Sequence, residues 1–110
     1  FTEVLGRRHL VVPYSAVTND ARFVLAPGYA RAEDFTDVCS VALQRLRREG
    51  REGYPKMLSV GLHPRWIGQA ARIGALERFL DEARSAGDVW IATRREIAEW
   101  WIAEHGRFER

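Results

Sequence analysis

The sequence contains only one cysteine, Cys39, in 110 residues, so no disulfide can form within the chain. That excludes a small secreted fold held by disulfides and is typical of a reducing compartment, which predicts a cytoplasmic location. Its helical neighbours Val38 and Ala42 are apolar. This setting favours a buried core thiol over a reactive nucleophile.

Long hydrophobic runs and a charge of one sign are lacking as well. No segment reaches the roughly 18 apolar residues of a membrane-spanning helix, and no secretion signal is visible. Lys and Arg (17) barely exceed Asp and Glu (15). Nucleic-acid binding usually needs a clustered basic face, whereas the most basic stretch, residues 45–51, is typical of the solvated end of a helix. We therefore predict neither a nucleic-acid nor a membrane partner.

Apolar residues alternate between strand-like and helix-like patterns along the chain. Unbroken apolar runs predict parallel strands buried on both faces, and amphipathic spacing predicts helices. A long irregular loop over 15–34 holds turn residues, and a loop of that length is uncommon unless it is functional. The order predicts an α/β fold with three parallel strands and right-handed crossovers. The expected strands are 9–14, 57–62 and 89–92, and the expected helices are 34–49, 70–85 and 94–105.

Particular residues are expected to bound or fill these elements. Asp34 is predicted to cap the first helix. Thr93 and Glu96 form a capping box for the last helix. Trp90 and Trp101 follow strand and helix spacing, which favours core positions.

Three βα units do not make a finished sheet. A closed eight-unit barrel needs about 250 residues, and a three-stranded sheet leaves two open edges. The fold is therefore expected to be incomplete alone. We expect residues 1–110 to be completed by a homo-oligomer or by an N-terminal companion chain.

The strongest local signal for chemistry is His63-Pro64-Arg65, directly after the second expected strand. Active sites of parallel α/β folds lie at the carboxyl ends of strands. An imidazole there can exchange protons near neutral pH, or it can simply hydrogen-bond a neighbouring loop. Arg65 could hold an anionic or carbonyl oxygen, or form only a surface salt bridge.

Other candidates lie near the same rim. Tyr14 follows Pro13, which should end the first strand, and it could bind substrate or pack in the core. Asp20, in the long loop, could orient a base, bind substrate or only shape a turn. Trp66 could stack on a sugar ring, although tryptophans are more often core residues.

Several kinds of site are not supported. The three histidines show no metal-ligand spacing, and a hydrolytic zinc site needs about three protein ligands. No Ser-His-Asp arrangement or phosphate-binding loop can be assigned. We therefore predict no metal and no cofactor in this chain.

These residues together resemble the later part of the polysaccharide deacetylase-like family, nearest to its allantoinase-like and peptidoglycan-deacetylase-like branch. Nearly the whole chain takes part, and the joint pattern is more specific than any one piece. The matching segments are 7–14, Asn19-Asp20, Arg22-Phe23, 55–63, 76–80 and 89–98.

The resemblance implies a distorted, incomplete (β/α) barrel that hydrolyses a non-peptide C–N bond. It implies that residues 1–110 form the C-terminal part of the catalytic domain. His63 would then be the general acid, and Pro13-Tyr14 would line the substrate groove. Substrates would be a ureide such as allantoin or an N-acetylated sugar. The resemblance allows a divalent metal such as zinc in a complete parent, held by residues absent from this sequence.

The sequence departs from the family after Trp66. Residues 68–72 read Gly-Gln-Ala-Ala-Arg where relatives commonly show Gly-Arg-Pro-x-Arg, so only Arg72 matches as a substrate contact. Two alternatives stay open for the chain itself. It is either an inactive α/β interaction module, or a carbohydrate-binding remnant that uses Tyr14 and Trp66.

Overall fold

A computed structural model describes residues 1–108, which fold as two compact units. One unit comprises residues 14–89. The other combines residues 1–13 with the chain from Trp90 onward. None of the helices in residues 1–108 is both long and apolar enough to cross a bilayer.

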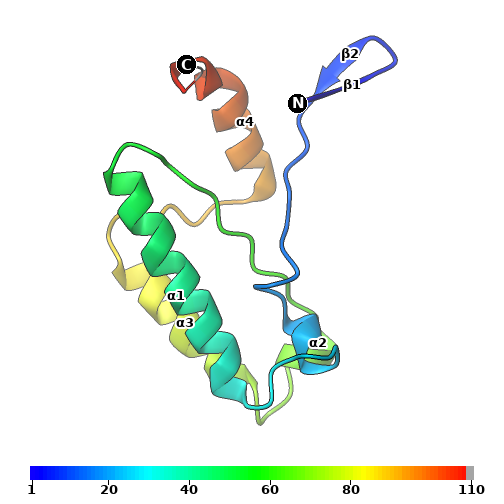
Figure 1. The fold of residues 1–110 in the computed structure, drawn as a ribbon, viewed down its shortest axis with the longest axis vertical. Helices are drawn as coiled ribbons and strands as arrows, with labels where there is room; N and C mark the ends of the chain where they lie inside the picture. Colours follow the sequence, from blue (N-terminus) through cyan, green and yellow to red (C-terminus); the bar gives the residue numbers. More distant parts are fainter. Residues whose placement is uncertain (109–110) are drawn as a thin grey trace. The chain divides into compact units, whose positions relative to one another are not determined.

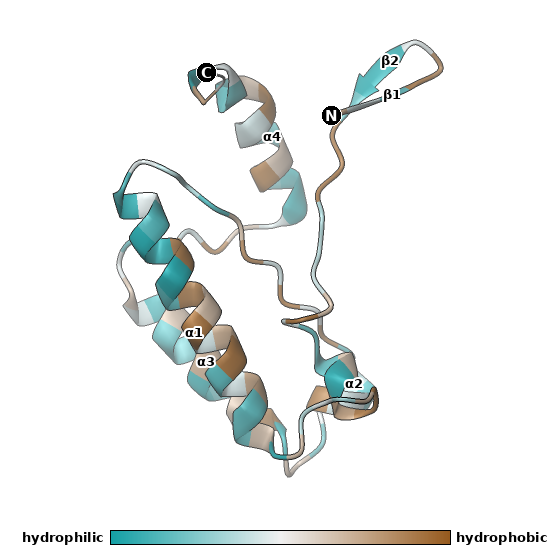
Figure 2. Cartoon of the chain, in the orientation of Figure 1, coloured by the Kyte–Doolittle hydropathy of each residue, from teal (hydrophilic) through white to brown (hydrophobic). Residues whose placement is uncertain are grey.

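Two helices, α1 (Ala32–Arg51) and α3 (Ile73–Ser85), lie side by side and form the centre of the unit 14–89 (Figure 1). Apolar residues recur at every fourth position along both facing sides, so packing one helix on the other buries them together. Figure 2 shows apolar segments on both helices where they adjoin. The buried side chains are Phe35, Cys39 and Leu43 from α1, and Ala75, Phe79 and Ala83 from α3.

Polar contacts fix the two helices against each other. Ser40 and Gln44 of α1 both hydrogen-bond the Glu82 carboxylate of α3. Near the end of α1, Arg47 and Arg51 pair with Asp88 at 2.6 and 2.8 Å. The Arg47 hydrogen bond is the main cause that lowers the pKa of Asp88.

The predicted first and second helices are confirmed, with different ends. α1 begins after Arg31 rather than after Asp34. Asp34 sits one turn inside the helix, where its Oδ2 accepts from the Ala30 and Arg31 amides, each at 2.8 Å. The predicted Asp34 cap is therefore wrong in position, because the same carboxylate reaches back to the free amides from the first turn. α1 also continues past Gly50 and ends near Gly53, whose φ is +93°.

The three predicted strands are wrong for the described part of the chain. Residues 57–62 run extended but make only one isolated parallel bridge, between Asn19 and Gly61. Residues 10–14 and 89–92 carry no assigned strand. A strand is stabilised by ladder hydrogen bonds to a neighbouring strand, and residues 1–108 contain no such neighbours for these segments. Leu58, Val60 and Val89 instead pack against the helical core.

The other unit contains an unpredicted hairpin, formed by antiparallel strands β1 (Thr2–Val4) and β2 (Arg7–His9). Leu5 and Gly6 turn between them with φ values of +50° and +72°. Positive φ at both central residues is the mark of the tight hairpin turn that matches strand twist.

Helix α4 (Arg94–Glu104) and the short 3-10 helix η2 (His105–Arg107) complete this unit. The predicted capping box is confirmed, since Thr93 accepts from the Glu96 amide and Glu96 accepts from the Thr93 amide. The predicted core position of Trp90 is wrong, because its side chain is 58% exposed. Trp101 is only half-buried and stacks on Phe108 with ring centroids 5.7 Å apart.

Candidate functional site

Two short helices in the unit 14–89 position the candidate site. The 3-10 helix η1 (Asp20–Phe23) starts at Asn19, whose side-chain oxygen accepts from the Ala21 amide at 2.8 Å. Helix α2 (Pro64–Ile67) starts at His63, with Pro64 in its first turn. Proline suits that position because it has no amide to leave unpaired. Each short helix thus places a candidate residue at its first turn.

A small parallel pairing joins the two segments that lead into these helices. The Gly61 amide donates to the Thr18 carbonyl at 2.9 Å, and the Asp20 amide donates to the Gly61 carbonyl at 3.0 Å. The Thr18 hydroxyl adds a hydrogen bond to the Ser59 carbonyl at 2.7 Å. Thr18, Asn19 and Asp20 are all buried. This pairing brings the long loop against the segment that ends in His63.

Asp20 is fully buried and accepts three hydrogen bonds, two from His63 and one from Ile67, the last residue of α2. Oδ2 accepts from the His63 amide at 2.7 Å and from the Ile67 amide at 3.2 Å. Oδ1 lies 2.7 Å from Nδ1 of the His63 ring. A buried carboxylate needs such partners, and one that faces Nδ1 favours the tautomer with the proton on that nitrogen.

The His63 ring is 38% exposed, so it is supported on one side and open to solvent on another. The Trp66 ring packs against it with centroids 4.4 Å apart. The Arg65 guanidinium lies 4.4 Å from the Trp66 ring centroid, within the range of a cation–π contact. The structure therefore groups His63, Arg65 and Trp66 together with Asp20.

Arg72 contacts the same cluster through the Trp66 backbone. Its guanidinium donates to the Trp66 carbonyl at 3.3 Å and lies 4.3 Å from the Phe23 ring centroid. These contacts link η1 to α2. They show a structural use for Arg72, while its predicted substrate contact stays a prediction.

Pro13 and Tyr14 lie at the boundary between the two units. Pro13 falls in the other unit, and Tyr14 begins the unit that holds His63. The Tyr14 side chain is 70% exposed. Their predicted place along a substrate groove therefore stays a prediction.

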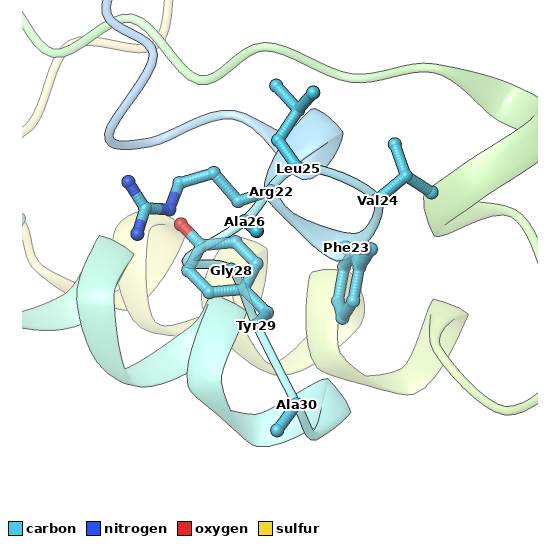
Figure 3. A pocket seen from close by; sticks show the side chains of 8 residues that line it. All are labelled: Arg22, Phe23, Val24, Leu25, Ala26, Gly28, Tyr29 and Ala30. Carbon is cyan, nitrogen blue, oxygen red and sulfur yellow. The ribbon is translucent and has the colours of Figure 1, made fainter.

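An open hollow lies beside the candidate site, lined by residues between Arg22 and Ala30 (Figure 3). Arg22 and the Tyr29 hydroxyl lie near each other on one side, and Phe23 lies on the other. Arg22 donates to the Pro27 carbonyl at 2.8 Å, and Tyr29 donates to the Val17 carbonyl at 2.6 Å. Burial is the main cause that raises the pKa of Tyr29. Both polar groups therefore serve to shape the loop.

The side chains described in residues 1–108 do not form a zinc site. Hydrolytic zinc centres use about three protein ligands, and within residues 1–108 no group of three His, Cys, Asp or Glu side chains could hold a metal. One ring nitrogen of His63 already faces Asp20, and no second histidine takes part in the contacts of the site described here.

Sequence reasoning missed three residues that build the site: Thr18, Gly61 and Tyr29. Thr18 and Tyr29 lie in the long loop, and Gly61 contacts it. The length of that loop was the only sequence signal for a function there. The contacts of the loop with Gly61 join residues more than forty positions apart, so no local sequence pattern predicts them.

Known proteins resemble this chain in sequence and in fold. No family model matches the chain. A Schizosaccharomyces pombe protein named "Putative polysaccharide deacetylase" is 40% identical over 96 residues, which are 87% of this chain and 30% of that protein. The crystal structure of a probable polysaccharide deacetylase from Pseudomonas aeruginosa PAO1 is 47% identical, with a TM-score of 0.83 over 88% of this chain and 32% of the other.

The crystal structure of Puue allantoinase is also similar, at 46% identity and a TM-score of 0.86. The match covers 91% of this chain and 33% of the allantoinase chain. The chain therefore spans about a third of the length of the relatives it matches. These matches support a fold that is part of a larger α/β domain.

Proposed function

We propose that this chain supplies the general acid of a C–N hydrolase. As the sequence predicted, most of the chain is similar to polysaccharide deacetylase-like proteins, and the match covers about one third of the length of each. The observation that carries the proposal is the buried Asp20 carboxylate 2.7 Å from His63 Nδ1. A carboxylate in that place orients the imidazole and leaves Nε2 to transfer a proton.

The proposed reaction hydrolyses an amide or ureide. A water molecule attacks the carbonyl carbon and loses its proton to a base outside residues 1–110. The C–N bond breaks, and the leaving nitrogen takes a proton from Nε2 of His63. The His63 ring enters this step as the imidazolium and leaves it as the neutral ring, with its remaining proton on Nδ1 beside Asp20. General acid catalysis of this kind typically contributes 10²–10⁴-fold. The substrate is a ureide such as allantoin or an N-acetylated sugar.

Trp66 and Arg65 are the proposed substrate contacts nearest the acid. The half-buried Trp66 ring packs on His63 and offers an apolar surface to a sugar or ureide ring. Arg65 lies over that ring and is otherwise exposed, so its guanidinium can donate to a carbonyl or anionic oxygen. Tyr14, Pro13 and Arg72 are further contacts on the strength of the sequence resemblance alone.

The remaining machinery would come from polypeptide beyond this chain. The domain is proposed as the C-terminal part of a polysaccharide deacetylase-like catalytic domain, in which a metal, where used, takes its ligands elsewhere. We place the enzyme in the cytoplasm, where a single free thiol is usual.

The proposal is tested by turnover of the full-length protein on allantoin and on an N-acetylated sugar, with release of product measured directly. We expect the variant His63→Ala to lose about 10²-fold or more of kcat on whichever substrate is hydrolysed, with its fold kept. His9→Ala is the matched control, because His9 is an exposed residue of strand β2. Near-normal turnover by His63→Ala would sink the assignment.

A non-catalytic interaction module is the second candidate. The observation in its favour is the set of extended segments with exposed apolar side chains, among them Val11, Leu62, Trp90 and Ile91. Absence of hydrolysis in the full-length protein on both substrate classes, combined with tight binding of a partner, would favour it.

A further inference from the structure

Gly61 contributes no side chain to the candidate site, yet it lies at the contact on which the site depends. It pairs in parallel with Asn19, two residues before His63 and one residue before Asp20 on the opposite segment. This backbone bridge therefore lies next to both Asp20 and His63 along the chain.

No room exists for a side chain at position 61. A methyl group added there would lie 2.2 Å from Nδ2 and 2.7 Å from Cγ of Asn19. Such distances are far below van der Waals contact, so one of the two residues must move. The backbone of Gly61 has no positive φ that would itself demand glycine, so the space occupied by Asn19 is the constraint.

Asn19 cannot move away without consequence. Its side chain is buried, and its oxygen caps η1 through the Ala21 amide. A shift of Asn19 is passed directly to Asp20, whose amide bonds the Gly61 carbonyl. The Asp20 carboxylate holds both the amide and the ring of His63, so its displacement reaches the ring.

We propose that Gly61 is a positioning residue: its lack of a side chain leaves room for the Asn19 side chain beside the bridge, and this arrangement sets the contact between Asp20 and His63. This inference rests on the proposed function for its kinetic consequence, but its structural consequence stands independently. Enzyme geometry of this kind is demanding, since a misplacement of about 1 Å can cost about 10²-fold in rate.

The first test follows the His63 ring by NMR in the full chain, through the resonances of the imidazole nitrogens and the Nδ1 proton. We expect Gly61→Ala to move or remove the Nδ1 proton signal and to shift the resonances of the imidazole nitrogens. Gly106→Ala is the matched control, because a methyl group at Gly106 would meet nothing within 4 Å. Unchanged His63 ring resonances in a folded Gly61→Ala variant would overturn the proposal.

A double-mutant cycle then tests the proposed cause. Asn19→Ala removes the two nearest clashing atoms, so Gly61→Ala should disturb His63 much less in that background than in the wild type. An equal disturbance in both backgrounds would overturn the proposal. Should Gly61→Ala fail to fold, Thr18→Val removes the hydrogen bond to Ser59 without adding a clash, and it must shift the same signal.

Kinetics of the full-length protein separate this inference from the proposed function. We expect Gly61→Ala to lower kcat about tenfold or more with a smaller change in KM. Should His63→Ala retain full turnover while Gly61→Ala still moves the His63 signal, the catalytic assignment fails and the positioning role stands. Should His63→Ala abolish turnover while Gly61→Ala leaves the signal and kcat unchanged, the positioning role fails alone.

Discussion

At the scale of single residues, Asp20 carries most of the site's geometry. It has no solvent exposure, and its two oxygens satisfy three donors from residues 63–67. An unpaired buried donor costs about 1–3 kcal/mol. The structure therefore commits this carboxylate to one arrangement, and the imidazole takes its orientation from it.

The variant Asp20→Asn tests that arrangement. An amide can present its oxygen to only part of the donor set, so either the His63 ring or the backbone amides lose an acceptor. We expect kcat of the full-length enzyme to fall about 10²-fold or more, with a loss of stability of about 1–3 kcal/mol. Asp37→Asn, an exposed carboxylate on α1, serves as control. Equal kinetics for the two variants would refute the role of Asp20.

Cys39 gives a second prediction at this scale. Its side chain is fully buried, and burial raises the pKa of the thiol to about 12. The neutral thiol thus favours the folded state below pH 9.0, and this contribution is lost as the pH rises toward 12. We expect almost no reaction with a thiol reagent at pH 8 in the native protein and one thiol per chain in denaturant. Rapid labelling of native protein would contradict the burial.

At the scale of elements, the pairing of α1 with α3 holds the unit that contains the site. Phe35 is fully buried between them, whereas Val41 on the same helix is 67% exposed. We expect Phe35→Ala to lower the free energy of unfolding by about 3–5 kcal/mol and Val41→Ala to change it by at most about 0.5 kcal/mol. Urea unfolding of both variants measures this difference, and similar midpoints would contradict the packing.

The helices were predictable from the sequence because their signals are local. Spacing of Phe35, Cys39 and Leu43 marks one face of α1, and the Thr93–Glu96 box marks the start of α4. Strands need partners from distant sequence, so the apolar runs 9–14, 57–62 and 89–92 gave wrong assignments. The hairpin at residues 2–9 was missed for a different reason: its strands are close in sequence, but they are charged and carry no apolar alternation.

The candidate site was partly predictable for the same reason. His63 stands out by its position at the end of an apolar run, and Asp20 by the length of its loop. Their contact was not predictable, because it depends on a bridge between segments forty-two residues apart. The bridge between Asn19 and Gly61 is made by backbone groups of Thr18, Asp20 and Gly61, and backbone hydrogen bonds cannot be read from residue types.

At the scale of the whole molecule, the matched relatives are about three times as long as the stretch they share with this chain. The extended segments expose apolar side chains that sheet neighbours would cover. We predict that the active species contains more polypeptide than residues 1–110. Native mass spectrometry of the active fraction measures this directly. A lone mass of 12.6 kDa that hydrolyses substrate would contradict the prediction.

The measurement that tests the proposed acid most directly compares two substrates of the full-length enzyme. One releases a basic amine, which must be protonated as it leaves, and the other is an activated ester whose leaving group needs no proton. We predict that His63→Ala loses about 10²-fold or more on the amide and far less on the ester. An equal loss on both substrates would mean that His63 is not the general acid.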